Sequence, residues 1–265
     1  MNETKKPTIN YDPWRNLNQF TTARIGLGRA GMSLTTSAYL DFQFAHAQAR
    51  DAVHIPLDFN RLAQNINLLG YQTLLLQSLA KNQAMYLQRP DLGRQLKESS
   101  HEDLKHNITT EIDVAIIVAD GLSSKAIEHH AEKFLGLLLP KLKASDYKLS
   151  PICLIKHARV AIGDAVAECC AARLCIVLIG ERPGLSSPDS MGIYFTYQAK
   201  ADLSTDVDRN CISNVHTNGL SYEQALIKLL YLVQESEKLH YSGVNLKDET
   251  SDSELNIQQG NFLLY

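Results

Sequence analysis

The stretch IDVAIIVADG, residues Ile112–Gly121, is a continuous apolar run rich in β-branched residues. Such a run predicts a strand that is covered on both faces, since a strand with one face in water alternates apolar and polar residues. It continues into SSKAIEHHAEKFLGLLLPKL, where Ser123 or Ser124 can cap a helix whose apolar face includes Ile127 and Phe134. A strand followed by a helix predicts the first half of a β–α–β unit.

Three further apolar runs downstream also predict strands, with helical patterns between and after them. The strands are expected at Ser150–His157, Arg173–Gly180 and Met191–Gln198, and the helices at Ile162–Ala172 and Ser221–His240. Strands that alternate with helices pair in parallel, because each crossover helix returns the chain to the same edge of the sheet. The expected fold is therefore α/β, with a mainly parallel, Rossmann-like sheet flanked by helices and preceded by a helical N-terminal region.

The segment before the first strand has a helical pattern from about residue 21 to residue 100. In one expected helix, Leu40, Phe44 and Ala47 share a face. A second helix is expected after a cap at Asp58 or Asn60. Its apolar residues are Leu62, Ile66, Leu69 and Leu75. The chain is expected to divide into four parts: a flexible N-terminal segment (1–20), a helical region (21–108), an α/β domain (109–243) and a polar C-terminal tail (244–265).

The composition is that of an ordinary globular protein, with 45% hydrophobic and 21% charged residues. The formal net charge of -3 gives no electrostatic reason to expect nucleic acid as a partner. No apolar run approaches the roughly 20 residues that span a bilayer, and the N-terminus lacks the apolar core of a secretory signal. Five cysteines without a C-x-x-C pair indicate a cytosolic protein with reduced thiols. No metal site is expected, because no ligands cluster at the spacing of a zinc site.

A second pattern, RIGLGRAG at Arg24–Gly31, matches the dinucleotide-binding pattern G-x-G-x-x-G without a gap. A working dinucleotide loop needs a buried strand before the first glycine and a helix after the last. Here the short, largely polar QFTTARI precedes Gly26, and Asp51, at the spacing of a ribose-binding acid, lies in a helical pattern. The pattern predicts a turn before a helix, or a ligand or partner loop that contains Arg24 and Arg29, and not a dinucleotide site.

The loop after the third expected strand, GERPGLSSPDS at residues 180–190, carries more information. In open parallel sheets ligands lie beyond the carboxyl ends of the strands, where this loop begins. Its glycines permit close backbone approach, and Pro183 and Pro188 reduce the entropy that is lost when the loop becomes ordered. The loop can present the Glu181 carboxylate to a large flat ligand with amide or hydroxyl donors, or it can only turn the chain and leave Glu181 solvated. The spacing alone leaves both interpretations open.

The stretch IGERPGLSSPDSMGIYFTYQAK, followed by DRNCISNVHTNGLSYEQA at Asp208–Ala225, resembles the small subunit of ethanolamine ammonia-lyase. Four supporting blocks occur along the chain in the family's order: TARIGLGRAG, YLQRPDLGRQL, VAIIVADGLSSKAI and ARVAIGDAVAECCAARLCIVLIGERPGL. The resemblance covers about residues 20–243, and its most specific parts are GERPGLSSPDS and DRNCISN. In the family the glycine loop reads more like CTGRAG, so Gly26 is a local substitution that creates the false dinucleotide pattern.

The resemblance implies an adenosylcobalamin-dependent lyase that converts ethanolamine to acetaldehyde and ammonia by radical chemistry. It implies a hetero-oligomer in which a separate large subunit, a TIM barrel, holds the substrate and the catalytic residues. This chain is then expected to enclose part of the corrin and its nucleotide tail, to be inactive alone, and to have no catalytic side chain. The D-x-H-x-x-G motif that replaces the lower ligand is absent, so the cofactor is expected to keep dimethylbenzimidazole as its lower axial ligand. By analogy with the family, the protein is expected in the cytoplasm, within a bacterial microcompartment.

Three positions correspond by resemblance to cobalamin contacts: Val160 in HARV, Glu181 in GERPG and Cys211 in RNCISN. Glu181 is expected to accept hydrogen bonds from the cofactor, while Val160 and Cys211 contribute backbone groups and packing. The family often has glycine where this chain has Ala158. For Cys211, the other interpretation is a small buried hydrophobic residue.

Four histidines are weaker candidates. His129 and His130 lie on a charged helical stretch and are expected in solvent. His157 and His216 lie near the loops at the ends of the strands and can approach the ligand.

Arg24, Arg29, Arg89 and Asp91 are candidates for the interface with the large subunit, where the donor fork of arginine is favoured. Two other functions remain open on the sequence alone. One is a free-standing α/β enzyme that acts on a nucleotide or small metabolite, and the other is a cobalamin-binding or scaffold protein without an enzyme partner.

Overall fold

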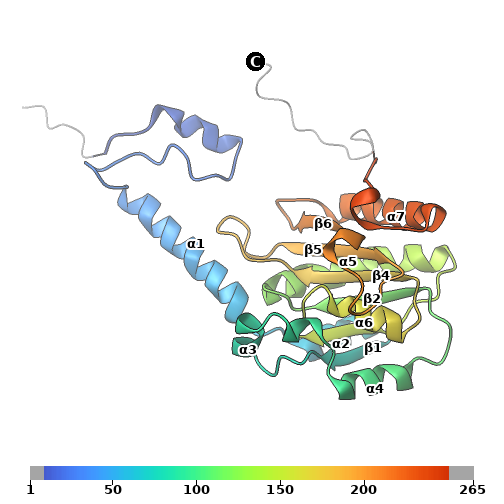
Figure 1. The fold of residues 1–265 in the computed structure, drawn as a ribbon. Coiled ribbons are helices and arrows are strands. Elements are labelled where there is room, and N and C mark those ends of the chain that lie inside the picture. Colours follow the sequence, from blue (N-terminus) through green and yellow to red (C-terminus); the bar gives the residue numbers. More distant parts are fainter. Residues whose placement is uncertain (1–8, 251–265) are drawn as a thin grey trace, which may run out of the picture.

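The computed structural model describes residues 9–250, which contain a six-stranded sheet in the order β1-β3-β2-β4-β5-β6 (Figure 1). The strands are β1 (Thr73–Gln77), β2 (Val114–Ala119), β3 (Ile152–Lys156), β4 (Leu174–Gly180), β5 (Met191–Tyr197) and β6 (Arg209–Val215). Strands β1 to β4 run parallel, whereas β5 is antiparallel to β4 and β6 is antiparallel to β5. The predicted α/β fold with a mainly parallel sheet is confirmed.

Helices cover both faces of the sheet. The helices are α1 (Thr36–His54), α2 (Phe59–Leu68), α3 (Gln83–Gln88), α4 (Glu98–Asn107), α5 (Ser124–Ala144), α6 (Ile162–Cys169) and α7 (Tyr222–Leu239). Helices α2, α5 and α7 pack on one face, called here the first face, and α4 and α6 pack on the other, the second face. Short 3-10 helices lie at η1 (Pro13–Gln19), η2 (Leu92–Arg94), η3 (Asp206–Asp208) and η4 (Gly243–Asn245).

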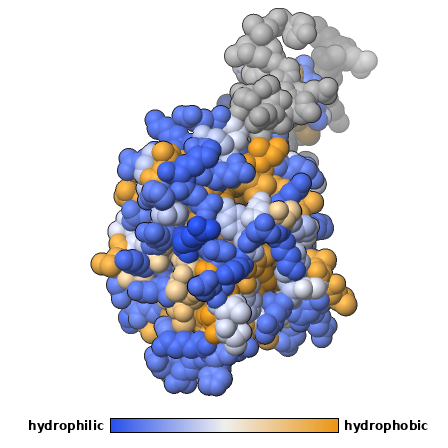
Figure 2. Space-filling view, turned by 90° about the vertical axis from the view of Figure 1, so that its right-hand side faces the viewer, coloured by the Kyte–Doolittle hydropathy of each residue, from blue (hydrophilic) through white to orange (hydrophobic). Residues whose placement is uncertain are grey.

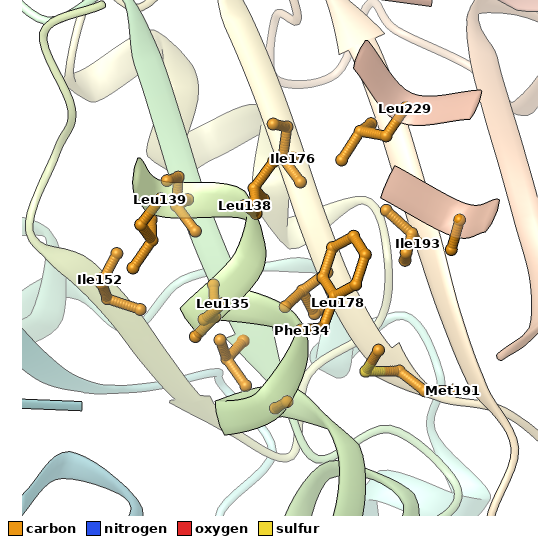
Figure 3. Packing of buried hydrophobic residues seen from close by; sticks show 14 of the residues in the cluster. Phe134, Leu135, Leu138, Leu139, Ile152, Ile176, Leu178, Met191, Ile193 and Leu229 are labelled. Carbon is orange, nitrogen blue, oxygen red and sulfur yellow. The ribbon is translucent and has the colours of Figure 1, made fainter. Parts of the chain in front are cut away.

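The first face holds the larger part of the core, and α5 crosses it (Figure 3). Phe134 and Leu138 of α5 are four residues apart and therefore lie on one side of the helix. They pack among Ile176 and Leu178 of β4 and Ile193 of β5, all of which are buried. Every residue of β2 and β4 is buried, as their continuous apolar runs predict.

Two strands differ from the sequence-based expectation. The helix expected to continue through Leu75 ends at Leu68, and Thr73–Gln77 forms β1 instead. Gly70, at a φ of 84°, turns the chain, and TLLLQ then pairs in parallel with β3. A short apolar run fits a helix or a strand equally well, and here the pairing with β3 decides between them. Strand β6 was not predicted, because more than half of RNCISNV is polar.

Helix α1 differs from the expected core helix. Leu40 and Phe44 are 56% and 65% exposed, and only Ala45 and Ala52 of α1 are buried. Figure 1 shows α1 projecting away from the sheet towards the segment that contains η1. Figure 2 shows the side of the molecule that lies on the right in Figure 1. On this side hydrophilic residues cover most of the surface, and hydrophobic residues form small groups. The exposure of Leu40 and Phe44 shows that the described residues leave these apolar side chains of α1 uncovered.

Residues 1–8 and 251–265 lie outside the described part of the chain. The start of the expected flexible segment and most of the expected polar tail therefore stay predictions, whereas residues 13–19 of that segment form η1. None of the helices within residues 9–250 combines the length and the hydropathy that crossing a membrane requires.

Candidate functional site

Asp120, directly after β2, organises the turn that follows β3 at the carboxyl edge of the sheet. Its carboxylate accepts hydrogen bonds from the backbone N–H groups of His157 (2.8 Å) and Ala158 (3.2 Å). Burial raises the pKa of this carboxyl to about 6, against the effect of the backbone donors. Asp120 thereby fixes the start of the turn that carries Val160 and leads into α6.

Gly180 brings the end of β4 against the turn between β2 and α5. A Cβ atom at this position would overlap the carbonyl oxygens of Ser123 and Asp120. The Leu122 N–H donates a hydrogen bond of 2.9 Å to the Gly180 carbonyl across the same contact. Since only glycine fits here, the approach of the two turns fixes the backbone from which Glu181 projects.

The Glu181 carboxylate is held in place and is not a freely solvated side chain. Its Oε2 atom accepts a hydrogen bond from Ser190 Oγ (2.5 Å) and one from the backbone N–H of Asn214 (3.3 Å). Its Oε1 atom lies over Gly192 of β5, where a Cβ atom would come within 3.0 Å. Among the described residues, no hydrogen bond reaches Oε1. One carboxylate oxygen is therefore anchored and the other is left as an acceptor.

Tyr194 joins Glu181 to Cys211. Tyr194 and Cys211 are register partners on β5 and β6, and a Cβ atom at Gly192 would meet the side chains of both Glu181 and Tyr194. Burial and the nearby Glu181 carboxylate both raise the pKa of the Tyr194 hydroxyl, so the phenol keeps its proton. Cys211 is exposed, which contradicts the interpretation of Cys211 as a buried hydrophobic residue. Although the residue as a whole is exposed, desolvation raises the pKa of its thiol, which therefore keeps its proton.

A buried ion pair ties the start of α6 to β6. Arg209 donates two hydrogen bonds to Asp164, at 2.5 and 2.8 Å, and both side chains are only 4% exposed. Val160, before α6, packs against the same apolar cluster of the second face as Tyr194. The three predicted cobalamin contacts thus lie on connected elements, with Val160 before α6, Glu181 after β4 and Cys211 on β6. Glu181, Tyr194 and Cys211 are called here the Glu181 surface, and Val160 lies on the same face of the sheet as Tyr194.

The prediction that both histidines of α5 lie in solvent is confirmed for His129 and wrong for His130. His129 is exposed as expected, but His130 is 2% exposed because it faces the Tyr222 hydroxyl of α7, at 2.7 Å. The i, i+1 pair therefore spans the boundary between solvent and core. Both rings approach Asp189 in the loop before β5.

Both histidines near the strand ends, His157 and His216, make contacts within the chain. The Nδ1 atom of His157 lies 3.6 Å from Asp120, and burial lowers the pKa of the imidazole. His216 contacts the Asn214 side chain (2.9 Å) and the Asn218 backbone N–H (3.3 Å) through its two ring nitrogens. His216 thus stabilises the turn after β6.

The glycine pattern near the N-terminus forms a loop. No strand leads into Gly26 within residues 20–26, which confirms that the pattern lacks the setting of a dinucleotide site. Arg24 donates a hydrogen bond to the carbonyl of Leu185 (3.2 Å), so this loop contacts the tip of the 180–190 loop. Arg29 pairs through its backbone with Asn10.

Arg89 and Asp91, the other candidates for a protein interface, form an exposed ion pair of 2.6 Å. The structure does not test the role of either residue at an interface.

Sequence reasoning missed Tyr194 and the pair of Asp164 and Arg209. The alternation in MGIYFTY could have identified Tyr194. Successive residues of a strand point to opposite faces, so Gly192 and Tyr194 share the face opposite to Met191, Ile193 and Phe195. No local signal links Asp164 to Arg209, since 45 residues separate them.

The hollows lined by the described residues are open. One of about 340 Å³ borders β6 at Cys211, and one of about 180 Å³ lies at the ends of β2 and β3 beside Asp120 and His157. A third hollow, of about 580 Å³, lies near α1, and Arg24 is among the residues that line it. Pockets of about 300–1,000 Å³ suit drug-sized ligands, and a larger ligand at the Glu181 surface would need a second chain to cover it.

Ser123→Ala is expected to lower the free energy of unfolding by about 1–2 kcal/mol. Ser123 Oγ caps α5 by accepting from the Ala126 N–H (3.2 Å) and donates to the Pro188 carbonyl (2.8 Å). Urea denaturation followed by circular dichroism measures the change. Ser99→Ala at an exposed position of α4 is the control and should change stability little; equal effects of the two substitutions would contradict the assignment.

Comparison with known proteins gives consistent matches along the chain. The profile of the ethanolamine ammonia-lyase light chain (EutC) family matches residues 11–247. A Pseudomonas fluorescens Pf-5 protein named ethanolamine ammonia-lyase small subunit is 49% identical over 269 residues, covering 98% of this chain and 97% of the relative. Proteins of the same name from Pseudomonas putida W619 and Pseudomonas aeruginosa PAO1 are 51% and 48% identical. The former alignment covers 96% of both chains, and the latter covers 100% of this chain and 99% of its relative.

Proposed function

The chain belongs to the ethanolamine ammonia-lyase light chain family, and from this premise we propose that it binds adenosylcobalamin together with a large subunit. In this role it is the non-catalytic subunit of a complex that converts ethanolamine to acetaldehyde and ammonia. The observation that carries the proposal is the Glu181 carboxylate, with Oε2 anchored and Oε1 left as an acceptor over Gly192.

The Glu181 surface suits a corrin by its chemistry. The amide side chains of a corrin are donors that a fixed carboxylate can accept, with about 1.5–3 kcal/mol for each charge-assisted bond. Tyr194 and Cys211 remain neutral beside it and add contact area without a second charge. When bound, the cofactor supplies the radical chemistry, and this chain binds and orients it.

The expected lower axial ligand is the cofactor's own dimethylbenzimidazole. His216, one of the two histidines near the strand ends, uses both ring nitrogens in contacts within the chain. These contacts within the chain leave His216 no free ring nitrogen for the cobalt. They support the expectation of dimethylbenzimidazole as the lower ligand, which rests on the absence of the D-x-H-x-x-G motif.

The open shape of the Glu181 surface supports a second chain as the other wall of the site. The apolar side chains of α1 that the described residues leave uncovered offer a place for that chain to dock. The partner is the large subunit, which is also expected to hold the substrate and the catalytic residues. By analogy with the family, the assembled enzyme is expected in the cytoplasm, within a bacterial microcompartment.

The double substitution Leu40→Ser and Phe44→Ser is expected to weaken binding of the large subunit at least tenfold. Both side chains are exposed, so the stability of the isolated chain should change little. Analytical ultracentrifugation of the mixed subunits measures the affinity. The control is Leu68→Ser at the exposed end of α2. Unchanged assembly of the double variant would remove α1 from the interface.

The proposed function is tested by co-expressing the chain with the large subunit and assaying ammonia release with adenosylcobalamin. Activity is expected only when both subunits are present. Deamination by this chain alone would contradict the non-catalytic role and favour a free-standing enzyme. Cobalamin binding without assembly or activity would favour a carrier protein.

A further inference from the structure

His129, His130 and Asp189 form a cluster of potential metal ligands that shares no residue with the Glu181 surface. The two histidines lie in the second turn of α5, and Asp189 lies in the loop that precedes β5. Their ligand atoms all lie within 4.8 Å of one another. The Asp189 Oδ2 atom is 3.0 Å from His129 Nδ1 and 3.6 Å from His130 Nε2.

His130 is the residue that points to a ligand. Its side chain is 2% exposed, and its Nδ1 atom lies 2.7 Å from the Tyr222 hydroxyl. Its Nε2 atom is buried and has no hydrogen-bond partner among the described residues, although it faces Asp189. Buried polar atoms normally have a partner, so an orphaned nitrogen beside a second imidazole and a carboxylate needs an explanation.

We propose that His129, His130 and Asp189 bind a zinc ion. Two imidazole nitrogens and one carboxylate oxygen are a known zinc ligand set, with water completing the coordination. Zinc–ligand bonds of about 2.0–2.1 Å place ligand atoms about 3.3 Å apart in a tetrahedral site. The two separations to Asp189 bracket this value, and the two imidazole nitrogens, which lie within 4.8 Å of each other, come together when the exposed His129 side chain rotates towards His130.

The surroundings of the cluster suit the metal. A hydrogen bond from His130 Nδ1–H to the Tyr222 hydroxyl leaves the Nε2 lone pair for the ion, which is the usual arrangement behind a metal-bound histidine. Burial lowers the pKa of His130 and so favours the neutral imidazole that binds metals. His129 and Asp189 are partly exposed, which gives the ion and its water a path.

The zinc ion would join α5 to the end of the 180–190 loop. The Ser123 side chain already makes such a link through the Pro188 carbonyl. The ion would therefore stabilise the loop that begins with Glu181. All three of its protein ligands come from this chain, so its binding does not depend on cobalamin or on the large subunit. Ligand spacing along the chain predicted no metal site, because Asp189 is 60 residues from His129 and only the fold brings them together.

Isothermal titration of zinc into the full chain, freed of metal by a chelator and then dialysed, tests the proposal. One zinc ion per chain is expected, and His129→Ala and Asp189→Asn should each weaken binding at least tenfold. Both replaced side chains are partly exposed, so the variants should fold, which circular dichroism checks. His106→Ala, at an exposed position of α4, is the matched control and should bind zinc normally. Absence of zinc binding by the unmodified chain would overturn the proposal, as would variants that bind zinc with the affinity of the unmodified chain.

Discussion

Asp164→Ala is expected to destabilise the chain by about 3–5 kcal/mol, because it leaves the Arg209 guanidinium buried without its partner. Arg209 is 4% exposed, so water cannot replace the two hydrogen bonds that Asp164 accepts. The contacts that remain are the Ser204 carbonyl at 3.2 Å and the exposed Asp206 carboxylate, 3.5 Å from Arg209 Nε, and neither replaces the two buried hydrogen bonds. Urea denaturation of the full chain measures the change in the free energy of unfolding.

Two further sets of variants show whether the destabilisation comes from the buried, unpaired charge and not from the loss of an ion pair as such. Glu111→Ala removes an exposed ion pair with Lys148 and should leave the denaturation midpoint almost unchanged. Combining Asp164→Leu with Arg209→Met removes both buried charges and should recover much of the lost stability. If Asp164→Ala has no larger effect than Glu111→Ala, the buried pair does not hold α6 to β6.

Glu181→Ala is expected to weaken adenosylcobalamin binding by the assembled complex about tenfold or more. The substitution removes the Oε1 acceptor over Gly192 and also leaves Ser190 Oγ and the Asn214 N–H without their carboxylate partner. A loss of tenfold corresponds to about 1.4 kcal/mol, close to the lower end of the contribution of one charge-assisted hydrogen bond. Spectroscopic titration of the cofactor into the complex gives the dissociation constant.

The controls for this titration distinguish charge, shape and position. Glu181→Gln keeps an acceptor in the same place and should show an intermediate loss. Glu102→Ala changes an exposed carboxylate on α4 and should bind the cofactor normally. An unchanged dissociation constant for Glu181→Ala, with normal assembly, would remove Glu181 from the site.

The sequence predicted the centre of the fold better than its edges. Strands β2 and β4 are buried on both faces, so their runs of apolar residues have few other structural interpretations. The edge strands β1 and β6 depend on pairing with a neighbour, and TLLLQ and RNCISNV carry no pattern that demands it. The apolar residues of α1 have a helical period, but a period does not say whether the face meets a core or another protein.

The candidate site was predictable only where its residues lie within one continuous motif. GERPGLSSPDS placed Glu181 at the end of a buried strand, and the structure adds that Ser190 from the same motif anchors it. Tyr194, Arg209 and Asp164 required the register of β5 and β6, which joins residues distant in the sequence. The fold places Cys211 in an exposed position on the edge strand β6, and its contact with the cofactor stays a prediction.

A structure of this chain in complex with the large subunit and adenosylcobalamin tests the proposed cobalamin contact most directly. The corrin is expected to lie on the Glu181 surface, with an amide group about 2.7–3.2 Å from the Glu181 carboxylate and with Val160 and Cys211 in contact. A corrin bound elsewhere in the complex, with Glu181 and Cys211 facing bulk water, would contradict the proposal.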